Sequence, residues 1–543
     1  MLAPPTTEAR RSLRAFFLLA ALPALATAQS LSFQDVAASA GVSFTLQNHP
    51  TAQKRMIETM AGGMAVFDYN GDGRPDIFFT NGAPIPSMTK SGPKDWNRLY
   101  RNDGGWKFSD VTAEAGLAGA GYAMGAAAGD FDNDGDVDLF IAGVYSNQLF
   151  RNDGGRFTDV AKAAGIASDR WSVAAGWFDY DADGLLDLFV VNYADWTVEF
   201  DRYCGDRNRN LRVYCHPKYL KPIANRLYRN LGQGKFQDVS AASGIGAFAG
   251  RGMSVAFADV DGDGTQDIFV TNDNLPNFFF RNEGQGNFAE EGLLAGVALP
   301  GHGKPVASMG ADARDYDNDG LPDIIVTALS GETFPLFHNE GGGLLEDATY
   351  PSGLAKAVAR LGGWSVGLAD FDNDGWKDLF TANSHVNDIV EKFEPYEYMQ
   401  QNMVMRNEKG KFSQPLSLPG KRAHRGSAIA DFDGDGRLDI VVSSLGAPAE
   451  LWKNSTANSG AWVAFQFVGK KSNRDGIGAC ITLGEQTNCQ ASAVGYASSS
   501  LVPVHFGLDG MKTIPDAEVV WPSGAKQTVS GLKAGQVVTV REP

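Results

Sequence analysis

Asp179-Tyr-Asp181-Ala-Asp183-Gly184-Leu-Leu-Asp187 is one copy of a nine-residue motif that occurs seven times in the chain. The other copies begin at Asp68, Asp130, Asp259, Asp315, Asp370 and Asp431, and all have glycine at the sixth position. Carboxylates packed this densely repel one another unless a cation lies among them. The repeat therefore predicts seven cation-binding loops.

The oxygen atoms of each loop indicate which cation to expect. Side chains at positions 1, 3, 5 and 9, with the carbonyl of position 7, offer a set of hard ligands. Calcium accepts six to eight oxygens in flexible geometry, whereas magnesium needs a tight octahedron, so we expect up to seven Ca²⁺ ions. Glycine at position 6 should adopt the positive φ of a sharp turn. The predicted ligands are Asp68, Asn70, Asp72, Arg74, Asp76; Asp130, Asp132, Asp134, Asp136, Asp138; Asp179, Asp181, Asp183, Leu185, Asp187; Asp259, Asp261, Asp263, Thr265, Asp267; Asp315, Asp317, Asp319, Leu321, Asp323; Asp370, Asp372, Asp374, Trp376, Asp378; Asp431, Asp433, Asp435, Arg437 and Asp439.

The loops differ from EF-hands at their C-terminal ends. An EF-hand loop needs a glutamate at position 12. Here that position is Phe79, Ile141, Val190, Val270, Val326, Thr381 or Val442. The residues after each loop are β-formers, such as Ile77-Phe-Phe-Thr80, so the loops are predicted to connect strands.

Charge and the N-terminus point to an exported protein. The 543 residues include 64 acidic and 47 basic side chains, a net charge of −17 that argues against a nucleic-acid partner. Arg10, Arg11 and Arg14 precede an apolar run over 15–26, and small residues at 26–28 resemble a cleavage site. We expect a signal peptide over 1–28, no membrane span, and a periplasmic or extracellular mature chain.

The cysteines form two local pairs, Cys204 with Cys215 and Cys480 with Cys489. An even number in an exported protein favours two disulfides, most simply within each pair, although four cysteines allow three connectivities. A zinc site is the less favoured interpretation because the chain has no Cys-x-x-Cys pair.

Each acidic loop belongs to a longer unit. An apolar strand lies on either side of the loop, and a turn and an aromatic strand such as Phe157-Thr-Asp-Val160 come next. Four short strands in each unit are typical of propeller blades. The turns are Arg101-Asn102, Arg151-Asn152, Arg229-Asn230, Arg281-Asn282, His338-Asn339, Arg406-Asn407 and Lys453-Asn454.

The two ends of the repeat array complement each other. No aromatic strand comes after Lys453-Asn454, while a spare one, Phe33-Gln-Asp-Val36, precedes the first loop. Closing the last blade with the N-terminal strand would leave no exposed sheet edge. We predict an all-β chain: a seven-bladed β-propeller over 29–455, closed in this way, and a small β-rich module over 461–543.

Long insertions separate loop and turn in the first, third and sixth units, and the largest spans 193–224. They are expected on the face opposite the acidic loops, where they either carry function or are plain decoration. Asparagine ends four strands there, and either caps a turn or lines a glycan or peptide pocket. The candidate ligand-binding residues are Asn81, Asn192, Tyr193, Asn272, Asp273, Asn383 and His385.

These repeats resemble FG-GAP/VCBS repeats, the calcium-bearing blades also found in integrin α-chain heads. Ser472-Asn-Arg-Asp-Gly-Ile-Gly-Ala479, His505-Phe-Gly-Leu508 and Trp521-Pro-Ser-Gly524 resemble the ASPIC/UnbV domain. The combination is similar to bacterial relatives of cartilage acidic protein. The resemblance implies an exported calcium-binding propeller with a β-rich C-terminal domain, associated with adhesion or extracellular matrix, and no settled biochemical activity.

Catalytic motifs are weak. Gly363-Trp-Ser365-Val-Gly367 matches Gly-x-Ser-x-Gly, but that motif requires a strand-to-helix turn, and here it lies on a predicted strand. No catalytic residue is assigned. The preferred interpretation is a binding or adhesion protein for an extracellular or envelope protein or glycan. The alternatives are a calcium-dependent secreted lyase or hydrolase acting on polysaccharides, and a structural envelope or assembly component.

Overall fold

β-Strands make up nearly all of the regular structure in residues 30–457 and 459–543, which this computed structural model describes. The predicted signal peptide lies outside the described residues. The helices are single turns, and none of the described ones is long and apolar enough to cross a bilayer. The all-β class is confirmed. The helices are α1 (Ala37–Ala40), α2 (Thr112–Ala115), α3 (Ala161–Ala164), α4 (Leu354–Val358), η1 (Met56–Thr59), η2 (Pro217–Tyr219), η3 (Ile245–Ala247) and η4 (Val390–Lys392).

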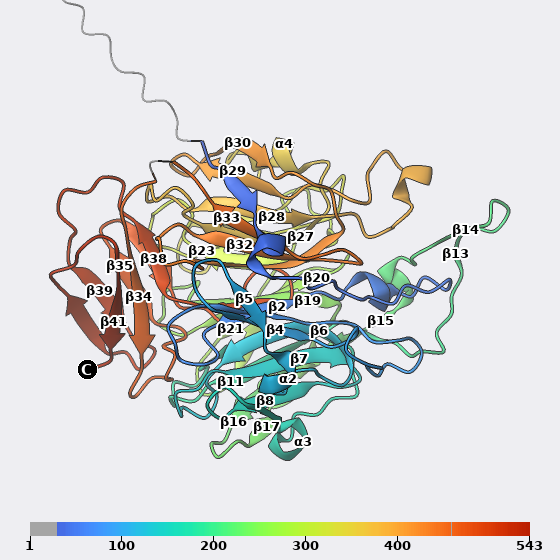
Figure 1. Ribbon diagram of the computed structural model, residues 1–543, viewed down its shortest axis with the longest axis horizontal. Helices are drawn as coiled ribbons and strands as arrows, with labels where there is room; N and C mark the ends of the chain where they lie inside the picture. Colours follow the sequence, from blue (N-terminus) through green and yellow to red (C-terminus); the bar gives the residue numbers. More distant parts are fainter. Residues whose placement is uncertain (1–29, 458) are drawn as a thin grey trace, which may run out of the picture.

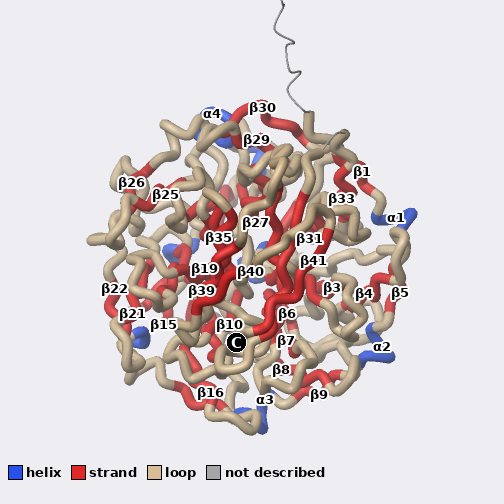
Figure 2. The backbone as a smooth tube through the Cα atoms, turned by 90° about the vertical axis from the view of Figure 1, so that its left-hand side faces the viewer, coloured by secondary structure: helices blue, strands red, loops and turns tan. Residues whose placement is uncertain are grey.

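Seven sheets repeat one antiparallel pattern of four strands, with an acidic loop between the first two. Figure 2 places last strands such as β5, β9, β22 and β26 at the rim. In chain order the first four sheets are β2 (Met64–Phe67), β3 (Asp76–Phe79), β4 (Arg98–Asn102), β5 (Phe108–Asp110); β6 (Tyr122–Gly129), β7 (Asp138–Val144), β8 (Gln148–Asn152), β9 (Phe157–Asp159); β10 (Ser172–Phe178), β11 (Asp187–Asn192), β16 (Arg226–Asn230), β17 (Phe236–Asp238); and β19 (Gly252–Ala258), β20 (Asp267–Asn272), β21 (Phe278–Asn282), β22 (Phe288–Glu290). The other three are β23 (Ala311–Arg314), β24 (Asp323–Val326), β25 (Leu336–Asn339), β26 (Leu345–Asp347); β27 (Gly363–Ala369), β28 (Asp378–Asn383), β29 (Met403–Asn407), β30 (Phe412–Ser417); and β31 (His424–Ala430), β32 (Asp439–Ser444), β33 (Glu450–Asn454) with β1 (Phe33–Asp35).

The N-terminal strand completes the seventh sheet. β1 pairs antiparallel with β33, and Phe33 lies opposite Asn454. The first strands of successive sheets contact one another in the order β2, β6, β10, β19, β23, β27 and β31, and β31 contacts β2 in turn. Small residues permit this close approach, since a Cβ on Gly125 of β6 would lie 2.4 Å from the carbonyl oxygen of Val173 in β10.

A second set of contacts links neighbouring sheets through the asparagine of each turn. The Asn152 amide of the second sheet donates to the Tyr69 carbonyl of the first sheet's acidic loop, at 2.9 Å. The same bond recurs from sheet to sheet, and Asn102 of the first sheet donates to the Phe432 carbonyl of the seventh, at 2.8 Å. The other donors are Asn230, Asn282, Asn339, Asn407 and Asn454.

The C-terminal region forms two more sheets at the loop-bearing end of the molecule, with Phe467 and Trp521 in a shared core. Figure 1 shows its strands at the left and the hairpin β13–β14 of the largest insertion at the right. Its strands are β34 (Trp462–Val468), β35 (Cys480–Leu483), β36 (Gln486–Cys489), β37 (Ser499–Leu501), β38 (Val504–Gly507), β39 (Ala517–Val520), β40 (Lys526–Val529) and β41 (Gln536–Arg541). The insertion strands are β12 (Ala194–Asp195), β13 (Cys204–Asp206), β14 (Leu211–Val213) and β15 (Lys221–Ala224), with β18 (Ala249–Gly250) beside β15.

One segment of the C-terminal region, 490–503, enters the space between the seven first strands. β37 pairs parallel with β2, which gives the first sheet a fifth strand. The segment also hydrogen-bonds to β6, β10, β19, β23, β27 and β31 through Ala126, Trp177, Ser254, Ala311, Ser365 and Ile429. Residues 490–503 therefore belong by sequence to the predicted C-terminal module and by contact to all seven sheets.

We predict that Asn102→Ala lowers the free energy of unfolding by about 1–3 kcal/mol, because it leaves the buried Phe432 carbonyl without its donor. Asn282→Ala, which removes the equivalent bond between two sequential sheets, should cost a similar amount. The exposed Asn208→Ala is the control. The measurement is the midpoint of chemical denaturation. A neutral Asn102→Ala beside a costly Asn282→Ala would mean that the first and seventh sheets are not joined in solution.

The inserted segment has a test of its own at Gly495, whose φ is +59° and whose added Cβ would lie 2.1 Å from Ser365 Oγ. Gly510 has a φ of +67° with open space around it. We expect Gly510→Ala to cost about 1–2 kcal/mol from backbone strain alone. Gly495→Ala should cost about 2 kcal/mol more, because the methyl group overfills the core. Equal melting temperatures for the two variants would contradict this position of the segment.

Candidate functional site

The last aspartate of each acidic loop holds the loop in shape. Asp187 accepts the Tyr180 N–H at Oδ2, 3.3 Å away, and the Asn230 N–H at Oδ1, 2.7 Å away. The first aspartate accepts the N–H of the loop glycine, as Asp179 does from Gly184 at 3.0 Å. The loop glycines all have positive φ, as predicted: Gly73, Gly135, Gly184, Gly264, Gly320, Gly375 and Gly436.

Burial makes the ionised loop carboxylates costly. It raises the pKa of Asp138 to about 9 and that of Asp76 to about 8, and in both cases neighbouring loop carboxylates raise the pKa further. The pKa of Asp130, Asp179, Asp267 and Asp323 rises to about 7, again mainly through burial. Without a countercharge these carboxyls would therefore tend to hold protons at neutral pH, and a cation among them would favour the ionised form.

The oxygen atoms left over in the loops fit a cation. In five loops the Oδ1 atom of the third position is buried and has no hydrogen-bond partner among the described residues: Asp132, Asp181, Asp317, Asp372 and Asp433. Acidic groups such as Asp130, Asp132 and Asp138 bring ligand atoms within 4.8 Å of one another. Uncompensated carboxylate oxygens at this spacing are the donor set of a hard divalent ion.

Basic side chains approach the same loops from outside. Arg229 contacts Asp181, and Arg406 contacts Asp372, both at 2.8 Å. In the first loop the position-3 side chain is an amide, and Asn70 donates to Asp72 at 3.1 Å. At positions 1, 3, 5 and 9 the first loop thus has three carboxylates, whereas the other loops have four.

The C-terminal sheets rest on these loops through the residues of their motif. The Arg474 N–H donates to Asn133 of the second loop at 2.9 Å, and Asp475 accepts the Asp130 N–H at 2.7 Å. His505 bonds to Asn373 of the sixth loop at 2.7 Å. Inside the domain, Ser472 and Ser523 both donate to Glu542. Two serines of the motif therefore close the domain, while its Arg474 and Asp475 face the acidic loops.

A cavity of about 320 Å³ lies at the other end of the sheets. Its walls come from the segment before the first loop, from the insertions of the third and sixth sheets, and from strand ends between them. The insertions meet where the Tyr214 N–H donates to Asn387 Oδ1 at 3.0 Å. The floor includes Trp364, which packs edge-on against Tyr496 of the inserted segment, with ring centroids 5.0 Å apart.

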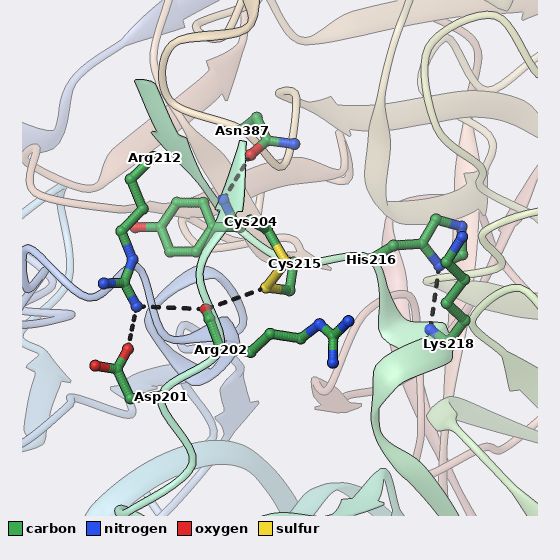
Figure 3. Close-up of a disulfide and its surroundings, with 9 residues drawn as sticks. Asp201, Arg202, Cys204, Arg212, Cys215, His216, Lys218 and Asn387 are labelled. Carbon is green, nitrogen blue, oxygen red and sulfur yellow. Dashed lines mark hydrogen bonds and ion pairs between the residues drawn. A yellow bond between two sulfur atoms is a disulfide. The ribbon is translucent and has the colours of Figure 1, made fainter. Parts of the chain in front are cut away.

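The disulfide Cys204–Cys215 fixes one wall of the cavity (Figure 3). It ties the ends of hairpin β13–β14 and places His216 next to the bonded Cys215, with both residues lining the cavity. Cys480 and Cys489 form the second disulfide, in the C-terminal domain. Both predicted pairings are present.

The predicted ligand-binding residues divide into two groups. Asn81, Asn192, Asn272 and Asn383 are buried, and each donates its amide to backbone carbonyls near a strand end. Each accepting carbonyl lies just before the third strand of the same sheet, and none of the four asparagines is among the described residues that line the cavity. Tyr193, Asp273 and His385 instead line the cavity.

Other cavity residues carried no sequence signal. Glu332 lies in the fifth unit outside any motif, and Trp364 lies in the Gly363–Gly367 stretch, which is predicted only to form a strand. Met56, Met60, Met253 and Met309 also line the cavity. An isolated methionine or glutamate is read from sequence as core or surface, so only the fold brings these side chains together.

Comparison with known proteins identifies the repeats. The FG-GAP-like repeat family matches residues 68–141, 130–190, 219–270, 259–326 and 315–381, more than half of the chain. The chain belongs to the FG-GAP-repeat family. The ASPIC and UnbV family matches residues 469–543. Both resemblances drawn from the sequence are thereby confirmed for this FG-GAP-repeat protein.

Relatives of this FG-GAP-repeat protein include cartilage acidic protein 1 of Mus musculus, 27% identical over 56% of this chain and 47% of the relative. Integrin alpha-4 of Xenopus laevis is 28% identical over 24% of this chain and 14% of its own. The chain spans about half the length of cartilage acidic protein 1. Among solved structures, an Agrocybe aegerita lectin aligns with a TM-score of 0.38 and 16% identity over 72% of this chain and 87% of the lectin. A rhamnogalacturonan lyase of Bacillus licheniformis aligns with a TM-score of 0.38 and 14% identity over 78% of this chain and 76% of the lyase.

Proposed function

We propose that this chain is an exported, calcium-stabilised, seven-bladed β-propeller that binds an extracellular or envelope protein or glycan in the cavity opposite its acidic loops. The observation that carries the proposal is the cavity itself, which is walled by insertions of two sheets and braced by a disulfide. Concave sites with a few converging polar groups are where proteins bind small ligands or the ends of larger ones. The matches to cartilage acidic protein 1 and to an integrin α-chain support an extracellular binding role.

Closure of the propeller is supported by two independent sets of contacts. The first strands contact one another in a cycle that returns from β31 to β2. The turn amides form a second cycle, in which Asn102 of the first sheet reaches Phe432 of the seventh. The strand β1 occupies the edge of the seventh sheet that would otherwise be open.

Calcium is the ion that the loops suit best. Their predicted ligands are carboxylate and carbonyl oxygens around a positive-φ glycine, and calcium accepts such oxygens in flexible geometry whereas magnesium needs a near-ideal octahedron. When bound, the ion supplies positive charge among carboxylates that burial makes costly to ionise. In this proposal the loops support the binding site from a distance, because they lie at the opposite ends of the strands.

Binding is preferred to general-base catalysis because of the hydrogen bonding of His385. Its Nδ1 atom accepts the Asn387 N–H at 3.0 Å, so the neutral ring carries its proton on Nε2. Burial lowers the pKa of His385 to about 4, so the ring is neutral at physiological pH. Nε2 is therefore a hydrogen-bond donor and has no free lone pair with which to accept a proton.

We predict that EGTA lowers the melting temperature by on the order of 10 °C, because several ions that bind only the folded state are lost. Removing calcium should also change how the stability of the fold depends on pH. Asp138, Asp76 and Asp130 have folded-state pKa values of about 7–9 against about 4 when unfolded, so the calcium-free folded state holds more protons than the unfolded state. Stability in EGTA should therefore fall as pH rises from 6 to 8, while calcium should abolish the fall. Identical melting curves with and without EGTA would contradict calcium binding.

Ligand binding is tested by breaking the wall of the cavity. We expect Cys204→Ser with Cys215→Ser to abolish or greatly weaken any binding found on a glycan array or a panel of purified matrix proteins. The expected cause is the loss of order in the wall that holds Cys215 and His216. Cys480→Ser with Cys489→Ser removes a disulfide far from the cavity and should leave binding unchanged. Equal binding by both double variants would mean that the ligand binds elsewhere on the protein.

A further inference from the structure

The charge of the cavity has one sign. Asp273, Glu332 and Glu394 line it, whereas none of the described lining residues is lysine or arginine. Glu394 is about half exposed, and the other two acids are more deeply placed. A buried carboxylate needs a nearby positive charge or several donors to remain ionised. The chemistry of the lining therefore favours a ligand that brings positive charge.

Asp273 and Glu332 are held in place by uncharged donors. Asp273 accepts the Tyr193 hydroxyl at 2.7 Å and the Asn274 amide at 2.8 Å. Glu332 accepts the N–H groups of Ala307 and Leu329, at 3.0 and 3.1 Å. Burial raises the pKa of Glu332, its two backbone hydrogen bonds lower it, and the charge of Asp273 raises it further. Both carboxylates line the same cavity.

Two guanidinium groups near this site are not among the residues that line it. Arg251 donates to the Leu220 carbonyl, and its charge also acts on Asp273. Arg425 lies 3.7 Å from the Trp364 ring and donates to the Thr59 and His424 carbonyls. Both guanidinium groups donate to backbone carbonyls, and neither forms an ion pair with Asp273 or Glu332 in the described part of the chain.

The remaining lining is apolar, aromatic and polarisable. Trp364, Tyr193 and Tyr214 contribute aromatic surface, and four methionines contribute thioether groups. Aromatic rings attract organic cations, and methionine adapts to irregular apolar shapes such as a cluster of methyl groups. Inorganic cations prefer oxygen ligands on all sides and would bind weakly between such apolar walls.

One buried donor points to a second feature of the ligand. His385 is 2% exposed, and its Nε2 atom has no hydrogen-bond partner in the described part of the chain. Since Nδ1 is already an acceptor, Nε2 is left to donate to a ligand oxygen. Glu394 lies 4.0 Å from this nitrogen, beyond hydrogen-bond reach.

We propose that the cavity binds a small organic ammonium ion that carries a hydroxyl or ether oxygen close to its charge. The inference rests on the proposed function, because it names the chemistry of the ligand at the same cavity. Asp273 and Glu332 balance the charge of the ammonium group, the aromatic and methionine walls contact its carbon atoms, and His385 donates to its oxygen. The same group is found free or on the headgroup of a lipid.

The probe is choline, and its control is 3,3-dimethylbutan-1-ol, which has the same shape but no charge. Titration calorimetry of the full chain in saturating calcium should detect choline binding, with the neutral alcohol weaker by at least about tenfold, a difference of about 1.4 kcal/mol. Cosedimentation with phosphatidylcholine vesicles separates a lipid headgroup from the free ion. Undetectable choline binding, or equal affinity for the alcohol, would overturn the proposal.

Matched variants locate the site. Asp273→Asn and Glu332→Gln should each weaken choline binding by about tenfold or more, while Glu346→Gln, an exposed acid on the fifth sheet, should leave it unchanged. If either buried variant melts at a much lower temperature, Glu394→Gln replaces it because its side chain is half exposed. Unchanged affinity in the folded cavity variants would overturn the assignment.

The outcomes separate this inference from the proposed function. A glycan or matrix protein that binds only while Cys204–Cys215 is intact, and that choline neither competes with nor mimics, would leave the cavity as a binding site. The same result would overturn the proposal that an organic ammonium ion is the ligand of the cavity. If binding instead does not depend on that disulfide at all, the proposed function is wrong.

Discussion

The structure depends on a hydrogen bond that each turn asparagine makes to the preceding sheet. Asn230 shows the geometry: its amide donates to the Phe131 carbonyl of the second sheet's loop, while its own N–H is held by Asp187 of the third. One residue thereby joins two sheets at the point where the acidic loops lie. Anything that displaces the last aspartate of a loop also displaces the amide between sheets. A change in the charge of a loop is for this reason expected to alter the packing between sheets.

This arrangement divides the molecule into a supporting end and a variable end. The acidic loops and the C-terminal sheets lie at the first, and the insertions and the cavity lie at the second. Segment 490–503 connects them, since the Tyr496 hydroxyl donates to the Met60 carbonyl at 2.7 Å beside the cavity floor. The C-terminal domain therefore reaches the cavity through the space between the sheets. We expect a change in the position of this domain to alter the contact between Tyr496 and Trp364.

The sequence predicts those features that repeat or that arise from local chemistry. The loops, their positive-φ glycines, both disulfides and the pairing of Phe33 with the last sheet could all be derived from spacing and residue type. The inserted segment could not, because Ser492, Gly495 and Ser499 have the composition of a surface loop. Its burial comes from bonds to strands hundreds of residues away, and such bonds leave no local pattern. The partners of the buried asparagines were hidden for the same reason.

The cavity proposed as the binding site lies where the repeated sheets differ from one another. Strand ends that are equivalent by repeat carry asparagine in four sheets, and these side chains donate to backbone carbonyls just before the third strand of the same sheet. The next one or two residues differ from sheet to sheet, and there Tyr193, Asp273 and His385 face the cavity. A seven-fold repeat of identical side chains would offer a ligand seven equal and shallow contacts. Placing an acid, a phenol and a neutral imidazole at neighbouring positions breaks that equality, and only an unequal set of groups selects both the charge and the orientation of a ligand.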